Sequence, residues 1–286
     1  MRDSPSSRRT VLRRLGAVGA FGALGGAATG CLGRAPPVFV ANASESTSLS
    51  ADTKRLDETT FDGYVSRMGR RYGESGVWGT GAAPAPTEAD FERATRLSLR
   101  ATSDGEEYAV ADAAVARYGL RRFDTEGRRH VAYWLWCAAK PLADSVWVDT
   151  LDRSLAVTLS SFEVGLDFDS SADLFDSAPS TRVSGPQAVS VATPGETGGG
   201  DVFDVDFPLH EGRVRPRVSG GDDAVSSGDD GSNADGEDDH DSYRLGWRGR
   251  FDGIQSVNGL CVAGESVSDS DATADWHVSL SASGWA

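Results

Sequence analysis

The chain has 286 residues and a formal net charge of -15, with 28 lysines and arginines against 43 aspartates and glutamates. This charge excludes the basic face that nucleic-acid binding needs, so we expect no nucleic-acid partner. No apolar run is long enough for a conventional multi-span membrane protein. With 39% hydrophobic residues, the chain can bury one substantial core in one or two domains.

The first 30 residues have the composition of an export signal. Arg8 and Arg9 stand in the run Ser-Arg-Arg-Thr-Val-Leu-Arg at 7–13, and a short, glycine-rich apolar segment follows over 15–30. The alternative is an ordinary basic amphipathic helix, but six glycines make a poor helix. The run resembles a twin-arginine signal, which directs the export of folded proteins. The resemblance implies that residues 1–30 engage an export machinery.

Cys31 follows the small residues Ala28, Thr29 and Gly30. This arrangement resembles a lipobox, although Ala28 stands where leucine is usual. The resemblance implies that Cys31 becomes the lipid-bearing first residue of a chain anchored at the extracellular face of the cell membrane. Cleavage near Gly30 without lipidation is the alternative. We expect residues 31–58 to form a polar tether, in which Asn42 begins a glycosylation sequon.

The acidic character extends over the whole chain after the signal. The first 30 residues hold five arginines and one aspartate, a charge of +4, which leaves -19 on residues 31–286. Aspartate outnumbers glutamate by 30 to 13, and all but two of the 28 basic residues are arginine. A dense carboxylate surface stays hydrated where salt screens charge strongly. The composition resembles that of twin-arginine-exported lipoproteins of halophilic archaea, which implies a location and a solvent but no activity. A cation binder or an acidic-tailed chaperone is the alternative.

The spacing of apolar residues predicts a helix near the start of the domain, over 57–72. Phe61, Tyr64, Val65, Met68 and Tyr72 fall on one helical face. Thr59 or Thr60 can cap its start, and Gly73 can end it. A second helix could begin at Pro86, but alternation after Arg93 favours a strand that ends in a turn at 103–105.

Most of the remaining chain alternates as β-strands do. Residues 130–138 are apolar on both faces, as in a central strand. Further alternating runs cover 155–168, 203–207, 243–251 and 276–280, with a bulge expected at Ser160-Ser161. Residues 108–118 fit either a strand or a helix. We therefore expect a mainly β fold, an antiparallel sandwich or barrel with one or two N-terminal helices, with α+β as the alternative.

Residues 220–241 interrupt this pattern. The segment holds eight aspartates and one glutamate and little that is apolar. It cannot bury enough surface to offset its ordering entropy, so we expect a disordered acidic insertion between two paired strands. The domain is expected to be a single one, over 59–286.

No familiar catalytic or cofactor motif occurs. Zinc motifs, phosphate-binding and dinucleotide-binding loops and the G-x-S-x-G nucleophile motif are absent, so we expect no metal and no cofactor. Acidic groups at Asp167, Asp169 and Asp173, and at Asp204 and Asp206, match no calcium loop. The four histidines are scattered, and tryptophans in strands are usually core residues; these are His130, His210, His240 and His277, and Trp134, Trp136, Trp247 and Trp276.

Two cysteines remain after Cys31, and both lie in apolar runs. Outside the cell, Cys137 and Cys261 could form a disulfide that closes a long loop. The alternative is two separate buried thiols. We read Asn258-Gly259 as a turn just before Cys261.

Two functions are compatible with these observations. The first is a surface-anchored, non-catalytic β-domain that binds or scaffolds at the cell envelope in high salt. The second is an extracellular hydrolase with an acid-rich site of unfamiliar pattern. The first predicts aromatic residues on an exposed flat face and no deep polar pocket. The second predicts a cleft where a histidine or two carboxylates converge.

Overall fold

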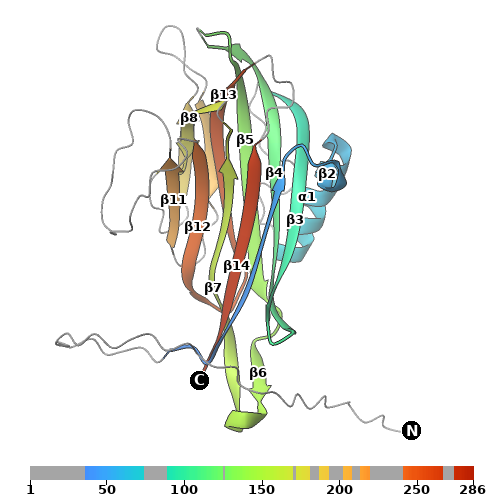
Figure 1. The fold of residues 1–286 in the computed structure, drawn as a ribbon, viewed down its shortest axis with the longest axis vertical. Coiled ribbons are helices and arrows are strands. Elements are labelled where there is room, and N and C mark those ends of the chain that lie inside the picture. Colours follow the sequence, from blue (N-terminus) through green and yellow to red (C-terminus); the bar gives the residue numbers. More distant parts are fainter. Residues whose placement is uncertain are drawn as a thin grey trace, which may run out of the picture.

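The fold is mainly β, as expected, with an antiparallel curled sheet and one helix in the part of the chain that the structure describes (Figure 1). The structure is a computed structural model. It describes residues 36–73, 89–124, 126–169, 172–180, 187–192, 202–207, 213–219, 241–266 and 274–286. The strands are β1 (Phe39–Ser48), β2 (Arg55–Leu56), β3 (Ala89–Ser103), β4 (Glu106–Phe123), β5 (Arg129–Pro141), β6 (Ser145–Val148), β7 (Arg153–Asp167), β8 (Ala172–Ala178), β9 (Gln187–Ala192), β10 (Val202–Phe207), β11 (Arg213–Ser219), β12 (Ser242–Phe251), β13 (Gln255–Glu265) and β14 (Asp275–Trp285).

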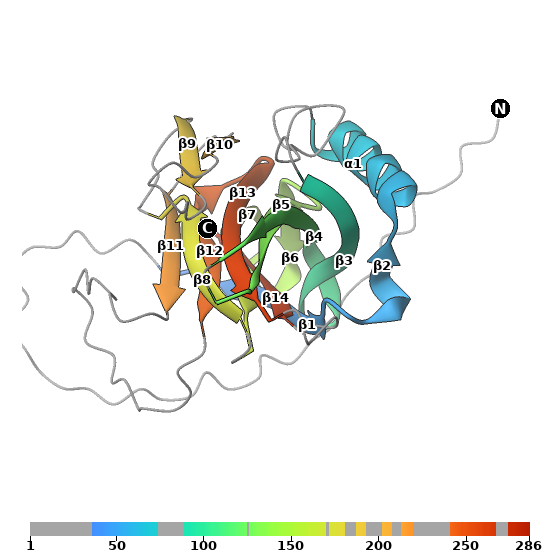
Figure 2. The same ribbon diagram turned by 90° about the horizontal axis from the view of Figure 1, so that it is seen from above.

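The large sheet has the order β11-β12-β7-β14-β1-β3-β4-β5-β13-β8, with β2 and β6 at its margins. Seen from above, it curls into a half-barrel (Figure 2). The curl brings β13 over β12, and a Cβ added at Gly259 would lie 2.9 Å from the Tyr243 hydroxyl. The prediction of a turn at Asn258-Gly259 is therefore wrong. Gly259 lies inside β13, where the close approach of β12 leaves no room for a side chain.

Helix α1 (Glu58–Tyr72) covers the outer side of β3, β4 and β5. Its start is capped by Asp57, whose carboxylate accepts a hydrogen bond from the Thr60 amide at 2.8 Å, rather than by Thr59 or Thr60. Its end is Gly73, with φ of 82°. The expected apolar face is buried on the sheet, where Phe61 meets Trp134 and Tyr64 meets Trp136 edge to face.

A buried carboxylate ties the last turn of α1 to the sheet. Asp112 of β4 accepts a hydrogen bond from the Tyr72 hydroxyl at 2.8 Å and contacts the Arg71 guanidinium at 2.8 Å. Its charge is therefore compensated although its side chain is only 6% exposed. The helix is held by polar contacts at its end as well as by its apolar face.

Several local predictions are confirmed. β3 and β4 are joined at Asp104 and Gly105, which have positive φ of 51° and 83°, as a tight hairpin turn requires. Residues 108–118, whose sequence fits either a strand or a helix, lie in strand β4. Where β14 pairs with β7, Ser281 lies opposite Ser161 and the next residue, Ala282, lies opposite Leu159. The register therefore skips Ser160 of β7, which is the extra residue of a bulge.

The expected tether over 31–58 is wrong for residues 39–48. This segment is β1, which pairs with β14 from Phe39 opposite Gly284 to Ser48 opposite Asp275. Ala41 is fully buried in the core. The folded domain therefore begins near residue 39 and not at 59. The polar composition that suggested a tether belongs to the solvent-facing side of a strand.

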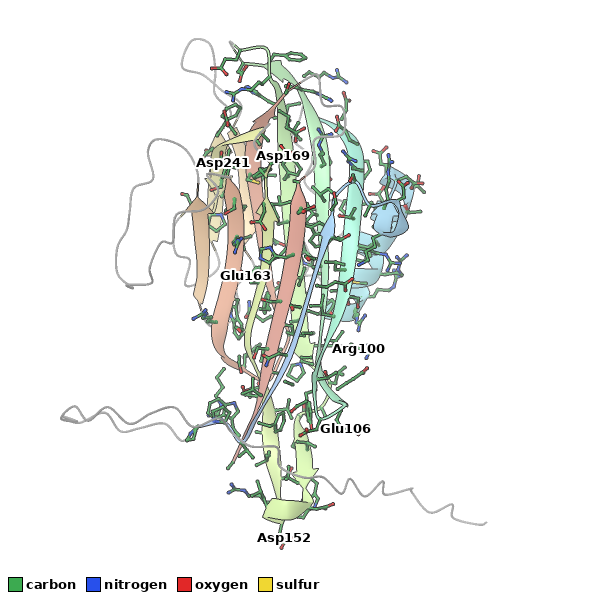
Figure 3. The ribbon with its side chains drawn as sticks, in the orientation of Figure 1. Arg100, Glu106, Asp152, Glu163, Asp169 and Asp241 are labelled. Atoms are coloured by element: carbon green, nitrogen blue, oxygen red, sulfur yellow. The ribbon has the colours of Figure 1, made fainter. Side chains whose placement is uncertain are left out.

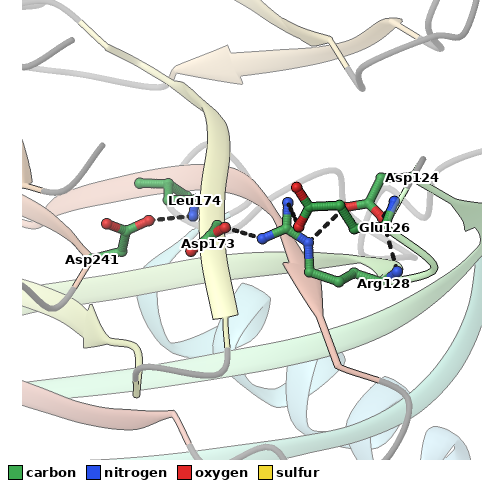
Figure 4. Close-up of polar contacts among 6 residues, drawn as sticks. All are labelled: Asp124, Glu126, Arg128, Asp173, Leu174 and Asp241. Atoms are coloured by element: carbon green, nitrogen blue, oxygen red, sulfur yellow. Dashed lines mark hydrogen bonds and ion pairs between the residues drawn. The ribbon is translucent and has the colours of Figure 1, made fainter. Parts of the chain in front are cut away.

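Most of the expected acidic insertion, residues 220–240, lies outside the described residues. The pairing of the strands on either side of it, β11 with β12, is confirmed. Asp241, the last residue of the expected insertion, is buried, and its carboxylate accepts a hydrogen bond from the Leu174 amide (Figure 4). Beside it, Arg128 joins Asp124 of the β4–β5 connection to Asp173 of β8. Asp241 therefore belongs to the ordered domain.

Candidate functional site

The outer face of β1, β14 and β7 carries small polar side chains that lie side by side across the three strands. Because strand residues alternate between faces, every second residue of β1 and β14 points away from the core. The registers place Asn42 opposite Ser281 and Ser281 opposite Ser161, and place Ser44 opposite Ser279. We call this surface the serine face; it consists of Asn42, Ser44, Ser46, Ser161, Ser279 and Ser281.

A shallow groove of about 500 Å³ lies on the serine face. It is lined by Asn42, Ala43, Ser44, Ser161, Ser279, Leu280 and Ser281. Hydroxyl groups both donate and accept hydrogen bonds, and the Asn42 side chain adds an amide with both functions. The groove is therefore suited to a ligand that carries hydroxyl or amide groups of its own.

A charged cluster borders the serine face. His277 of β14 lies between two carboxylates of β7, with Nε2 3.4 Å from Glu163 and Nδ1 3.4 Å from Asp167. Arg244 of β12 contacts the same Asp167 at 2.7 Å. Glu163 is labelled in Figure 3. The cluster thus has two carboxylates and two cationic partners, and three strands hold it in place.

Gly165 makes this cluster possible. It stands between Glu163 and Asp167 on β7 and directly opposite His277. A Cβ added there would lie 2.9 Å from His277 Nε2 and 2.8 Å from Arg244 Cγ. Both distances are shorter than ordinary contacts, so the absence of a side chain lets the imidazole lie across the strand.

The carboxylates determine the charge of His277. Hydrogen bonding to Asp167 and then to Glu163 raises the pKa of His277 to about 9, against the opposing effect of burial. The pKa of Asp167 is lowered, first by its hydrogen bond to His277 and also by Arg244. At neutral pH His277 is therefore a cation that donates from both ring nitrogens, rather than a base that accepts a proton.

A second ionic network is buried on the inner side of the sheet. Arg117 of β4 contacts Glu92 and Glu265, and Glu265 also accepts a hydrogen bond from the Tyr133 hydroxyl. Burial raises the pKa of Tyr133 well above its usual value. The Arg117 and Glu265 side chains are 8% and 4% exposed, so solvent hardly reaches the network. It joins β3, β4, β5 and β13 and offers no open face to a ligand.

Of the two alternatives for Cys137 and Cys261, the disulfide is wrong and the pair of separate buried thiols is confirmed. Both cysteines are free and fully buried. Cys137 of β5 pairs with Val257, and Cys261 lies four residues further along β13. Four strand residues span about 13 Å, well beyond the reach of a disulfide. Burial raises the pKa of both thiols, as expected for two separate apolar thiols.

The structure does not gather the acidic calcium candidates into a site. Asp167 is paired with Arg244 and His277, and Asp173 is paired with Arg128. Among the described residues, no group of three or more histidine, cysteine, aspartate or glutamate side chains could hold a metal ion. Asp204 and Asp206 lie in β10, whose backbone alone is described.

The histidines and tryptophans lie mainly in the core. His130 is buried, with its ring centroid 5.0 Å from that of Phe175. Trp134, Trp136, Trp247 and Trp276 are fully buried and offer no face to a sugar. His210 and His240 lie outside the described residues.

The residues of the export signal and anchor, Arg8, Arg9 and Cys31, also lie outside the described residues. Asn42 is exposed on the serine face, and its glycosylation stays a prediction. Within the described ranges, no helix is long and apolar enough to cross a membrane.

The serine face itself was not expected from the sequence. Serines at every second position of 44–48 and 279–283 were a signal for it. The first group lies in the segment whose polar composition predicts a tether. The serines of the second group occupy the polar positions that alternate with the apolar residues of the last strand. Only the register, which sets β1 beside β14, unites the two groups.

No family model and no curated protein matches the sequence. One solved structure, described as a "Pore forming protein", is similar with a TM-score of 0.34 and 10% sequence identity. The similarity covers 62% of this chain and 77% of that chain. Likeness at this level carries no argument about function.

Proposed function

We propose that this protein is exported through the twin-arginine route, cleaved before Cys31 and anchored by lipid at the extracellular face of the cell membrane. Its β-domain is non-catalytic and uses the serine face to bind or scaffold at the cell envelope in high salt. The signal at Arg8 and Arg9 and the small residues before Cys31 support the route and the anchor.

The observation that carries the binding role is the serine face with its groove. Hydroxyl and amide groups that line an open groove across paired strands favour recognition of an extended polar partner over enclosure of a small molecule. The strands beneath it hold these groups in fixed positions, which lowers the entropy lost when a partner binds.

The charge state of His277 bears on the hydrolase alternative. A hydrolytic histidine accepts a proton from a nucleophile or from water, and this requires a neutral imidazole at working pH. Two flanking carboxylates keep His277 protonated instead. The cluster therefore suits electrostatic pairing with a partner better than proton abstraction, which is why we favour the binding role.

Two pairs of variants test the route and the anchor. Replacing Arg8 and Arg9 with lysine should stop export, whereas the same change at the neighbouring pair Arg13 and Arg14 should not. Cys31→Ser should leave the exported protein held only by non-covalent contacts that an alkaline carbonate wash releases, whereas Cys261→Ala should still require detergent for its release. A Cys31→Ser protein that still requires detergent rejects the lipid anchor.

The binding role is tested with the full-length Cys31→Ser protein and washed cell envelopes in molar salt. We expect the protein to sediment with the envelopes and Ser279→Arg to release it. Ser98→Arg, at an exposed position of β3, is the matched control and should change nothing. Equal sedimentation of the two arginine variants would exclude the serine face as the binding surface.

A further inference from the structure

Exposed apolar side chains gather at one end of the molecule. Among the described residues, six large apolar side chains are well exposed, and the most exposed is Trp147 at 59%. Five of them lie where the described chain starts and where the β6–β7 hairpin projects (Figures 1 and 3). We call this group the apolar end; it consists of Val38, Val40, Leu142, Trp147 and Leu151. The sixth, Phe123, closes β4 at the opposite end.

The β6–β7 hairpin extends beyond the body of the sheet. The pairing of β14 with β7 stops at Trp285 opposite Ala156. Towards the tip only β6 continues beside β7, from Ser145 opposite Ala156 to Val148 opposite Arg153. Asp152 marks the tip in Figure 3. Trp147 and Leu151 therefore lie on a projecting hairpin, away from the core that buries Trp134, Trp136, Trp247 and Trp276.

The start of the domain places Cys31 near this end. Val38 is hydrogen-bonded through its amide to the Gly284 carbonyl at 2.8 Å, beside the base of the hairpin. Val38 is the seventh residue after Cys31, and a fully extended chain over seven residue steps spans at most about 25 Å. A lipid on Cys31 would therefore hold the apolar end close to the bilayer surface.

We propose that the apolar end is a membrane-contact surface that rests in the lipid headgroup layer, with Trp147 at the boundary between water and hydrocarbon. This inference depends on the lipid anchor of the proposed function. Tryptophan and leucine favour this interfacial position. Asp144, Asp149 and Asp152 limit the insertion to a shallow one, because their carboxylates must stay hydrated.

The contact would affect both the strength of membrane attachment and the orientation of the domain. A single lipid chain holds a protein only weakly and reversibly, and a second membrane contact makes the attachment stable. The hairpin and the lipid together would also fix the orientation of the domain. The long axis of the sheet would then point away from the bilayer and present the serine face to the envelope (Figure 1).

Site-specific fluorescence tests this contact. Leu151→Cys and, as a matched control at the opposite end, Phe123→Cys are labelled with an environment-sensitive fluorophore. Native Cys137 and Cys261 are fully buried and do not react in the folded protein, and in the lipidated protein the Cys31 sulfur carries the lipid. The full mature protein is reconstituted in phosphatidylcholine vesicles that contain nitroxide-labelled lipid, in molar NaCl. Flotation of the vesicles reports attachment independently.

We expect the label at 151 to lose most of its fluorescence to the lipid-borne quencher and the label at 123 to lose almost none. Adding Trp147→Ser should restore much of the fluorescence at 151. If the protein floats with the vesicles but both labels are quenched only by aqueous iodide, the membrane contact is rejected and the anchor stands. If the protein does not float, the anchor and the contact are rejected together.

Discussion

Phe39 and Gly284 interlock the first and last strands of the described domain. The two residues are paired across β1 and β14, and the Phe39 ring occupies the space above Gly284. A Cβ added at Gly284 would lie 2.7 Å from Phe39 Cζ and closer still to two other ring atoms. The segment nearest the proposed anchor is therefore built into the sheet, and force on the anchor would act on β1 directly.

Gly284→Ala should destabilise the domain because the Phe39 ring has to move. Overpacking of this kind costs about 1–3 kcal/mol. Gly69→Ala, at a half-buried position of α1, is the control, because an added Cβ meets nothing within 4 Å. It should stabilise the domain by about 0.5–1 kcal/mol through helix propensity. Urea unfolding in molar salt measures both, and equal effects would contradict the interlock.

The sequence predicted the elements whose own residues carry a strong periodic pattern. The apolar face of α1 is one such pattern, and the alternation that breaks at Ser160 is another. β1 was missed because its inward positions Ala41 and Ala43 are small and acquire their burial from β14 and β3. The prediction of a turn at Gly259 was wrong for a related reason, because side chains of β12 exclude a side chain there. A glycine required by a neighbouring strand looks the same in sequence as a glycine required by a turn.

The His277 cluster should make stability depend on pH. The pKa of His277 in the folded state, about 9, lies above its ordinary value of 6.5. The stabilisation is therefore complete below about pH 6.5 and is lost as the pH rises towards 9. The shift corresponds to at most about 3 kcal/mol at low ionic strength, and salt reduces it because the side chains are partly exposed.

Chemical unfolding followed between pH 6 and pH 10 measures this loss, and His277→Gln should remove most of it. Nuclear magnetic resonance titration of the imidazole gives the pKa itself. Gly165→Val should lower that pKa, because the new side chain displaces the ring from both carboxylates. An imidazole that titrates near its ordinary value in the native protein would refute the ion-paired cluster.

The acidic composition should make folding depend on salt. Residues 31–286 carry about -19 charges, and their mutual repulsion disfavours the compact state in dilute buffer. The screening length falls to about 3 Å at 1 M salt, so the melting temperature should rise steadily as KCl is added. Sucrose, which carries no charge, is the comparison. A melting temperature that responds to sucrose but not to KCl would remove the argument for a high-salt habitat.

The lipid anchor depends on the fate of Cys31, and mass spectrometry of the protein extracted from membranes tests it directly. We expect the first residue of the mature chain to be Cys31, with a mass increase from covalently attached lipid that Cys31→Ser abolishes. A membrane-derived chain that retains residues 1–30, or that carries an unmodified Cys31, would contradict the lipid-anchored β-domain.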